Sequence, residues 1–398
     1  MTWPLKMMGK SNMTKITFIL SLLVMLLGVS GCGTVKGWLE EEVHELPPTE
    51  LVDFTAEITP VKLWSTDTGG GSDSDYSDIA VWLQNEMAVV VDYEGDVSAY
   101  NAATGARLWK VSLDVPVITG AGGGENLIFI GTQEGEILAL DETNGLLLWK
   151  QQLTSEVLAP PKAARGVVVA RTADGRMRGL SIADGTVLWN YQRKVPLLSL
   201  RGASAAVLSN DKVIAGYANG KLVALSIEGG QVIWEKNVAV PRGRSELERL
   251  VDVDSEPVIK NGIVYAVAYH GQIAAFDIES GRKLWARDMS SRSGLDVAEN
   301  NNIYISDDED YVWALQGRDA LWRQTRLLRR RLTAPVVVGD QVIVGDLEGY
   351  VHWIARDDGR FVARAQISKS AIRSKPVVKD DIVYILANDG ELTAFRIQ

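Results

Sequence analysis

The chain is built from short runs in which apolar and polar residues alternate, separated by turns that contain glycine. Tyr93–Leu113 shows the pattern, with the sequence YEGDVSAYNAATGARLWKVSL. Gly95 follows an acidic residue in the first turn, and Gly105 stands in a second turn four residues before Trp109. Alternation with a period of two is typical of strands with one buried face, and glycine supplies the positive φ that tight hairpin turns need. The pattern predicts consecutive antiparallel strands.

The same frame repeats along the chain at intervals of 39 to 51 residues. The first turn recurs at eight positions: Gly95, Gly135, Gly175, Gly220, Gly271, Asp310, Gly349 and Gly390. Two apolar runs precede each of these turns and two follow it, so each repeat holds four strands. Repeats of about 40–45 residues with four strands are typical of β-propeller blades. We therefore expect an all-β fold, an eight-bladed propeller of four-stranded blades, with no long helix after the N-terminal apolar run.

The last repeat ends at Gln398 before it reaches a fourth strand, and a candidate for that strand lies at the other end of the chain. Residues 60–65 read PVKLWS, which resembles the KLW and VLW of the outer strands. We expect Pro60–Ser65 to pair with Glu391–Arg396. This pairing would close the ring and leave no long exposed sheet edge.

A tryptophan stands at the same place in the last strand of most repeats. The set is Trp109, Trp149, Trp189, Trp234, Trp285 and Trp322, and the seventh repeat has Ala363 there. We interpret these residues as large rings packed between neighbouring blades. The alternative is a tryptophan stacked on a quinone cofactor.

The N-terminus has the features of a bacterial lipoprotein signal. Three lysines precede an apolar run from Ile16 to Val29, and Ser30-Gly31-Cys32 follows it. The run is too short for a spanning helix. We predict a signal peptide at 1–31, a lipid on Cys32, an acidic tether at 32–58 and the propeller at 59–398. The alternative is an ordinary cleaved signal with an incidental cysteine.

Composition excludes several classes of function. The formal net charge is −10, which argues against a nucleic-acid partner. Cys32 is the only cysteine, so disulfides cannot staple the fold. The core must come from the repeated apolar strands, for which the chain is long enough.

No motif for catalysis, cofactor binding or metal binding stands out. The three histidines are far apart in the sequence, and neither a metal-ligand spacing nor a nucleophile elbow occurs. We therefore predict no catalytic, cofactor or metal site. The basic run at 323–331 is interpreted as a solvated loop between blades.

Two connections between blades carry the features of a protein interface. The longest runs from Trp234 to Pro257 and contains Asp252 and Asp254. The connection before it contains Leu198, Leu200 and Arg201. Both lead into inner strands, of the fourth and fifth blades, so they lie on one face. An apolar anchor with arginine and a charged rim favours a docking site. Equally, the leucines could begin a buried strand and the aspartates cap a turn.

The repeats resemble the tryptophan motifs of quinoprotein dehydrogenases, which are also eight-bladed. That resemblance covers the repeat frame only, and those enzymes commonly carry a vicinal cysteine pair that this chain lacks. A quinone (PQQ)-dependent oxidoreductase and a polysaccharide-binding propeller are the alternative functions.

The whole chain more closely resembles the BamB family, lipoproteins of the outer-membrane β-barrel assembly (BAM) machinery. The matching segments are VSGC at 29–32, the eight repeats, LSLRG at 198–202 and RLVDVDSEP at 249–257. The resemblance implies a non-enzymatic scaffold on the periplasmic face of the outer membrane. In such lipoproteins a residue other than Asp after the lipidated cysteine implies sorting to the outer membrane, and Gly33 follows Cys32 here. It implies that the POTRA domains of BamA bind to Leu198, Leu200, Arg201, Asp252 and Asp254. It leaves direct binding of nascent outer-membrane proteins open.

Overall fold

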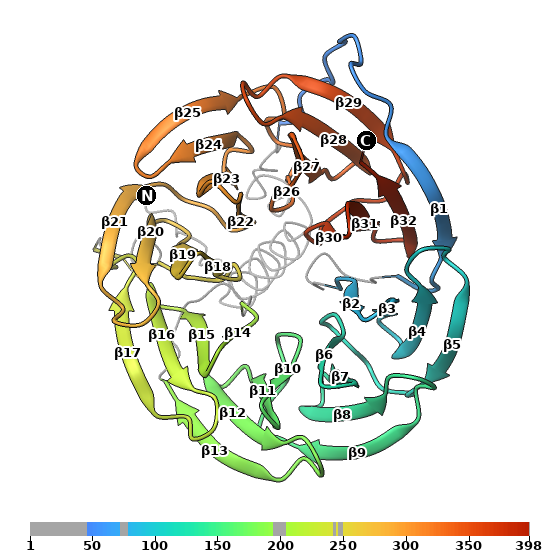
Figure 1. The fold of residues 1–398 in the computed structure, drawn as a ribbon, viewed down its shortest axis with the longest axis vertical. Helices are drawn as coiled ribbons and strands as arrows, with labels where there is room; N and C mark the ends of the chain where they lie inside the picture. Colours follow the sequence, from blue (N-terminus) through green and yellow to red (C-terminus); the bar gives the residue numbers. More distant parts are fainter. Residues whose placement is uncertain (1–45, 72–78, 194–203, 242–243, 246–249, 398) are drawn as a thin grey trace, which may run out of the picture. The chain divides into compact units, whose positions relative to one another are not determined.

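The computed structural model describes residues 46–71, 79–193, 204–241, 244–245 and 250–397. Within these residues it consists of strands and turns, without a helix. Eight four-stranded antiparallel sheets form the blades of a ring (Figure 1). Neighbouring inner strands contact each other all the way round, including the last pair, β30 and β2. The predicted all-β, eight-bladed propeller is confirmed.

Each blade runs from an inner strand to an outer strand in chain order. Blade 1 contains β2 (Trp82–Gln84), β3 (Met87–Val91), β4 (Asp96–Asn101) and β5 (Arg107–Ser112). Blade 2 contains β6 (Gly122–Gly124), β7 (Leu127–Gly131), β8 (Glu136–Asp141) and β9 (Leu147–Gln152). Blade 3 contains β10 (Lys162–Ala164), β11 (Val167–Arg171), β12 (Arg176–Ser181) and β13 (Val187–Gln192). Blade 4 contains β14 (Val207–Ser209), β15 (Lys212–Tyr217), β16 (Lys221–Ser226) and β17 (Val232–Asn237).

The second half of the ring follows the same plan. Blade 5 contains β18 (Val258–Lys260), β19 (Ile263–Val267), β20 (Gln272–Asp277) and β21 (Lys283–Asp288). Blade 6 contains β22 (Gly294–Val297), β23 (Asn302–Ser306), β24 (Val312–Gln316) and β25 (Asp319–Gln324). Blade 7 contains β26 (Val336–Val338), β27 (Gln341–Gly345), β28 (Tyr350–Ala355) and β29 (Phe361–Gln366). Blade 8 contains β30 (Val377–Lys379), β31 (Ile382–Leu386), β32 (Glu391–Arg396) and, as its outer strand, β1 (Val61–Asp67).

The ring closes as the sequence predicts. β1 is the first strand of the chain, and it pairs antiparallel with β32, the last (Figure 1). The register runs from Val61 opposite Arg396 to Asp67 opposite Glu391. The apolar core is divided into eight clusters, each shared by two neighbouring blades. Because every blade buries its faces against its neighbours, the pairing of β1 with β32 supports blades 1 and 7 as well as blade 8.

The turn between the second and third strands explains the recurrent glycine. Gly95 has φ of 91°, and a Cβ there would collide with the carbonyl oxygen of Val115 in the connection to blade 2. The sixth blade has Asp310 at this place, with φ of 63°. Its carboxylate accepts hydrogen bonds from the backbone of Arg331 (2.9 Å) and Leu332 (2.8 Å) in the next connection. Aspartate tolerates this conformation better than most residues. We call the face that carries these turns and connections the loop face.

Most outer-strand tryptophans bind the next blade, as the structural interpretation predicts. The indole nitrogens of Trp64, Trp109, Trp149, Trp189, Trp234 and Trp322 each donate to the carbonyl that directly follows the third strand of the next blade, at 2.7–3.0 Å. The ring of each packs on the glycine three residues further along. These glycines are Gly105, Gly145, Gly185, Gly230, Gly281 and Gly359, where an added Cβ would lie 2.5–2.8 Å from the ring.

The segment before β1 belongs to the same compact unit as the propeller, which begins at Pro48. We call residues 48–58 the strap; they were assigned to the tether from the sequence. The amide of Glu57 donates to the carbonyl of Val362 (2.9 Å), and Phe54 lies against Phe361 with the ring centroids 5.5 Å apart. The strap therefore packs on blade 7. The signal peptide, Cys32 and residues 32–45 of the tether lie outside the described residues, and their assignment stays a prediction.

One expectation about the basic run at 323–331 is wrong. Arg330 is not solvated: its side chain is only 2% exposed. Its Nε donates to Oδ2 of Asp346 at 2.6 Å, Nη2 pairs with Glu348, and Nη1 donates to the carbonyl of Thr49 in the strap at 2.8 Å. The sequence pattern did not reveal this buried ion pair, because the partners of Arg330 lie in blade 7 and in the strap.

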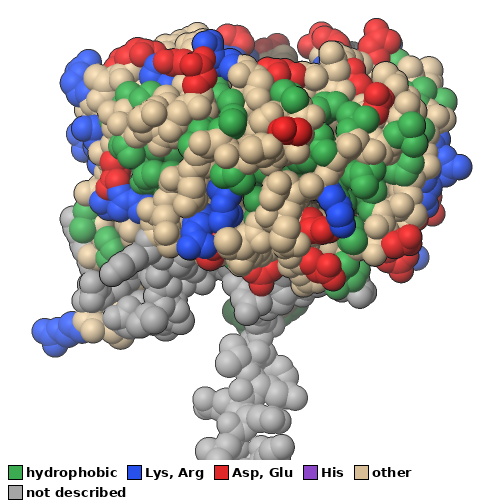
Figure 2. Space-filling view, turned by 90° about the horizontal axis from the view of Figure 1, so that it is seen from below, with side chains coloured by type: hydrophobic (Ala, Val, Ile, Leu, Met, Phe, Trp, Pro, Cys, Tyr) green, Lys and Arg blue, Asp and Glu red, His purple; other side chains and the backbone are tan. Residues whose placement is uncertain are grey.

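The outer surface of the ring carries hydrophobic side chains between charged ones (Figure 2). The residue before the tryptophan is exposed in six outer strands, at Leu108, Leu148, Leu188, Ile233, Leu284 and Leu321. In the described part of the chain, no helix has the length and hydropathy needed to cross a membrane.

Candidate partner-binding site

The connection between blades 4 and 5 is fixed to both blades on the loop face. The amide of Asn219 in blade 4 donates to the carbonyl of Val251 at 2.9 Å. The amide of Tyr269 in blade 5 donates to the carbonyl of Asp252 at 2.8 Å. Asp252 thus forms β-bridges with Ala218 on one side and Tyr269 on the other. The backbone at 251–253 acts as a short strand between two turns.

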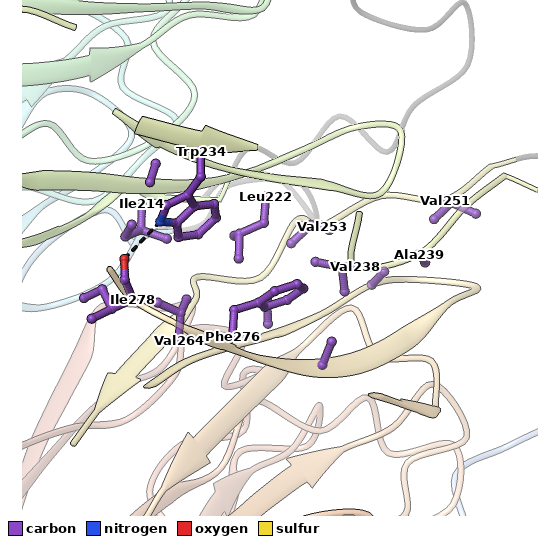
Figure 3. Close-up of a cluster of buried hydrophobic side chains, with 14 residues drawn as sticks. Ile214, Leu222, Trp234, Val238, Ala239, Val251, Val253, Val264, Phe276 and Ile278 are labelled. Carbon is purple, nitrogen blue, oxygen red and sulfur yellow. Dashed lines mark hydrogen bonds between the residues drawn. The ribbon is translucent and has the colours of Figure 1, made fainter. Parts of the chain in front are cut away.

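Alternation within Leu250–Asp254 sends the two valines into the core. Val251 is 3% exposed and Val253 is fully buried, in the cluster shared by blades 4 and 5. Figure 3 shows Val253 near Val238 and Val251 near Ala239, in the same cluster as Trp234 and Phe276. A Cβ on Gly216 would collide with Val253, so this glycine allows the close approach. The valines therefore hold the backbone that carries the two aspartates.

Asp252 is part of the structure of this junction. Its side chain is 1% exposed, and its Oδ1 accepts a hydrogen bond of 3.3 Å from the amide of Asn219. A carboxylate in this position stabilises the turn between β15 and β16. The turn-capping alternative considered from the sequence thus describes this contact of Asp252.

Arg171 is a charged residue of this region that the sequence reasoning missed. It ends β11 in blade 3, and its Nη1 donates to the carbonyls of Gly216 (2.7 Å) and Ser204 (3.3 Å). Its guanidinium carbon lies 4.6 Å from the centre of the Tyr217 ring, a cation–π contact. Burial lowers the pKa of Arg171, and the charges of Tyr217, Asp254 and Asp252 oppose that shift. The available signal was an arginine at the end of the apolar run VVVAR, where the other repeats have smaller or uncharged residues.

Asp254 is the carboxylate of this region for which the described residues supply no hydrogen bond. It is half-buried, and neither of its carboxylate oxygens has a hydrogen bond within the described residues. Burial raises its pKa to about 8, the charge of Asp252 adds to the rise, and the charge of Arg171 opposes it. A buried carboxylate without a hydrogen bond is costly.

The structure brings together only part of the predicted site. Asp252 and Asp254 lie two residues apart on the loop face, as expected. Leu198, Leu200 and Arg201 fall in the segment 194–203, outside the described residues. That segment leads into β14 of blade 4, and the aspartates precede β18 of blade 5. The blade assignment of both connections is therefore confirmed, whereas contacts of the two leucines and Arg201 stay a prediction.

The chemistry available at this site is recognition of charge and hydrogen-bond donors. Arg171 is held by backbone carbonyls and Asp252 by a backbone amide, whereas the buried oxygens of Asp254 make no hydrogen bond within the described residues. Among the described residues, no group of three or more histidine, cysteine, aspartate or glutamate side chains is placed to hold a metal ion.

Comparison with known proteins relates the chain to a single family. The family profile described as "Outer membrane protein assembly factor BamB" matches residues 93–320 and 316–398. Outer membrane protein assembly factor BamB of Pseudomonas aeruginosa is 47% identical over 381 residues, which are 95% of this chain and 98% of that protein. Its counterpart in Escherichia coli K12 is 36% identical over 376 residues, or 91% and 94% of the two chains.

Solved structures agree with this relationship. The crystal structure of BamB from Moraxella catarrhalis has a TM-score of 0.78 at 27% identity, and it covers 85% of this chain and 100% of that one. The quinohemoprotein alcohol dehydrogenase from Comamonas testosteroni has a TM-score of 0.66 at 11% identity, covering 84% and 76% of the two chains. At that identity the likeness to the dehydrogenase extends to the fold alone.

Proposed function

The chain belongs to the BamB family of outer membrane protein assembly factors, and from that premise we propose that it docks the POTRA domains of BamA through the loop face at blades 4 and 5. Its role in outer-membrane protein assembly is that of a scaffold subunit of the BAM complex and not of an enzyme. The propeller supplies a rigid surface, and the connections at 194–203 and 238–257 supply the contacts. Only the fold supports the dehydrogenase alternative.

Asp254 carries this proposal. The backbone immediately before it is held by the buried Val253 and by the bridges of Asp252, so its position is set before any partner arrives. Its carboxylate nevertheless has no hydrogen bond within the described residues. A preorganised charged group of this kind is typical of a binding hot spot, since the partner completes its hydrogen bonds and shields it from water.

The partner group that fits Asp254 is a cation, an arginine or lysine of the docking domain. Such a group stabilises the ionised carboxylate and lowers its pKa from about 8. Near pH 7 most Asp254 side chains are protonated in the free protein. Docking through this contact therefore releases a proton, which distinguishes it from docking through apolar contacts alone.

Binding of the isolated POTRA domains of BamA to the mature protein tests the proposal. Truncating a hot spot costs about 2 kcal/mol or more, so Asp254→Ala should weaken binding roughly 30-fold. Arg201→Ala should show a loss of the same order. Asp340→Ala is the control, because Asp340 is an almost fully exposed aspartate, with 96% of its side chain accessible, in a turn outside these connections; it should bind as the wild type does.

Calorimetry in two buffers of different ionisation enthalpy measures the proton. The wild type should release a proton on docking near pH 7, and Asp254→Asn should not. If Asp254→Ala and Arg201→Ala both bind normally, the docking surface lies elsewhere on the propeller.

The anchor is the second part of the proposal. We place the protein on the periplasmic face of the outer membrane, held by a lipid on Cys32, with residues 33–47 as the tether ahead of the strap. Metabolic labelling with a fatty acid should mark the wild type and leave Cys32→Ala unlabelled. Label on the Cys32→Ala variant would exclude this residue as the acylation site.

A further inference from the structure

One junction in the ring has the outer-strand tryptophan but lacks the turn that covers it. Six tryptophans donate to a carbonyl of the next blade and pack on its turn glycine. Figure 3 shows one such junction, in which the indole of Trp234 in blade 4 points at the carbonyl of Ile278 in blade 5. Trp285, at the junction of blades 5 and 6, has no such hydrogen bond within the described residues. The equivalent glycine, Gly317, has no atom within 4 Å of where its Cβ would be.

A shorter turn in blade 6 causes the difference. In blade 5, Ala275 pairs with Trp285, ten positions later, around a long turn. In blade 6, Ala314 pairs with Trp322, only eight positions later. The shortened turn of blade 6 does not reach the indole of Trp285. Arg287 contacts this turn instead, because Nη1 of Arg287 donates to the carbonyl of Arg318 at 2.8 Å.

An open groove remains where the turn would have been. It has a volume of about 820 Å³ and lies between β21 and the turn from β24 to β25. Its lining includes Trp285, Arg287, Gln316, Gly317 and Arg318. The Arg318 side chain is exposed and makes no ion pair within the described residues. The groove thus offers the indole of Trp285 and the cation of Arg318, and it is also lined by the carboxylates of Asp288 and Asp319.

The other six junctions show what fits such a place. Each is filled by a five-residue turn that ends in a glycine of positive φ, such as Asp141–Gly145. The amide of Gly145 donates to the carbonyl of Asp141 at 2.8 Å, and the Asp141 carboxylate accepts from the amide of Thr143, also at 2.8 Å. This turn presents the carbonyl of Glu142 to the indole of Trp109.

We propose that the groove between blades 5 and 6 binds a β-hairpin turn of a partner protein. The turn has five residues and ends in glycine, like those at the six covered tryptophans, and it takes the Asp-x-x-x-Gly form of residues 141–145 and 277–281. The partner's carbonyl accepts from the indole of Trp285, its glycine packs on the ring, and its aspartate faces Arg318. The groove lies on the outer strands of blades 5 and 6, whereas the site for POTRA domains lies in the connections into blades 4 and 5. The two proposals therefore stand or fall separately.

A labelled cyclic peptide tests the proposal on the mature protein. The probe is a disulfide-closed hairpin carrying the Asp-Glu-Thr-Asn-Gly sequence of residues 141–145, and the readout is fluorescence anisotropy. The wild type should bind it, and Trp285→Ala should weaken binding by about tenfold or more, as expected for loss of an aromatic anchor. Trp285→Phe keeps a ring but removes the N–H donor, so its loss should be smaller. A peptide with valine in place of the glycine should not bind.

A turn graft protects the test from effects on folding. Residues 316–319 are replaced by the sequence of 277–282, which restores the long turn in blade 6. The graft should cover Trp285, raise the melting temperature and abolish peptide binding. Failure of the wild type to bind the peptide at millimolar concentration, or equal binding by the graft, would overturn the proposal. Binding of a polysaccharide fragment in the groove, in place of the peptide, would also overturn it.

Discussion

Two aspartates, Asp346 in blade 7 and Asp254 before blade 5, show opposite uses of a buried charge. Asp346 is fully buried. Its Oδ1 accepts from the amides of Glu348 (2.9 Å) and Tyr350 (3.0 Å), and its Oδ2 bonds to Arg330 (2.6 Å) and His352 (2.9 Å). Asp254 is less buried, yet it has no hydrogen bond within the described residues. Burial alone does not separate the two residues; the number of partners does.

The pKa shifts follow from this difference. Burial would raise the pKa of Asp346, but the hydrogen bonds from His352 and Arg330 and the charge of Arg330 outweigh it and hold the pKa below its usual range. Burial lowers the pKa of His352, and Nδ1 of His352 accepts from Nε of Arg364 at 3.1 Å, so the neutral ring carries its proton on Nε2. At Asp254, the charge of Arg171 offsets only part of the effect of burial, and the pKa rises to about 8.

The two aspartates differ in whether the described residues complete their hydrogen bonds. The cluster around Asp346 holds the strap, because Arg330 and Arg364 donate to the carbonyls of Thr49 (2.8 Å) and Val52 (3.0 Å). It is completed within the chain. The cluster around Asp254 is left incomplete, which costs stability in the free protein and favours a complex that supplies the missing donor.

Removing the carboxylate of Asp346 should have the largest effect on stability. Asp346→Ala leaves the guanidinium of Arg330 buried without its main partner, which costs about 3–5 kcal/mol. Urea denaturation monitored by tryptophan fluorescence measures the loss. Asp340→Ala, at an exposed aspartate, is the control and should unfold close to the wild type. A wild-type midpoint for Asp346→Ala would mean that the cluster contributes nothing to the fold.

Removing the carboxylate charge of Asp254 should have the opposite effect and stabilise the folded protein at high pH. Because the pKa of Asp254 is higher in the folded state than its ordinary 3.8, the folded state binds this proton more tightly. The stability tied to this proton is fully present below about pH 4 and is lost as the pH rises towards about 8. Asp254→Asn removes this loss. The variant should be more stable than the wild type near pH 8, with little difference near pH 4.

Urea titrations at both pH values check this sign. The matched variant Asp346→Asn should destabilise the protein at neutral pH, where Asp254→Asn stabilises it. If both variants destabilise at pH 8, the contrast between the two aspartates does not hold.

The smallest effect is expected where the strap meets solvent. Arg360 pairs with Glu57 at 2.7 Å, but both side chains are almost half exposed, and such surface pairs contribute little. Arg360→Ala should leave the melting temperature nearly unchanged. Arg364→Ala, which removes the bond to the strap carbonyl of Val52, should lower it clearly. Limited proteolysis within 48–58 provides a second readout, and equal cleavage of the two variants would contradict the distinction.

The candidate site was predictable only in part. Asp252 and Asp254 were identified by their place in the longest connection and by family resemblance. Arg171 was not identified, because its sequence neighbours are apolar and the residues it faces lie 33 or more positions away. The different roles of the two aspartates were also invisible, since Val-Asp-Val-Asp alternation gives both the same pattern. Only the bridges of Asp252 to Ala218 and Tyr269 separate a residue that joins two blades from one that is left open.

The sequence by itself determined the repeat, the number of blades and the strand that closes the ring. These features depend on the local spacing of glycine, apolar residues and tryptophan. The strands of one hairpin are close in sequence, so their pairing leaves a pattern that can be read from the chain. Tertiary structure decided which charges are buried, which of them are completed, and which tryptophan is left without its turn. The turn of blade 6 is visibly short in the sequence, yet its consequence falls on Trp285 in blade 5. Such effects arise at the junctions between blades, where residues distant in the chain share one environment and the partner of each polar group is set by the neighbouring blade.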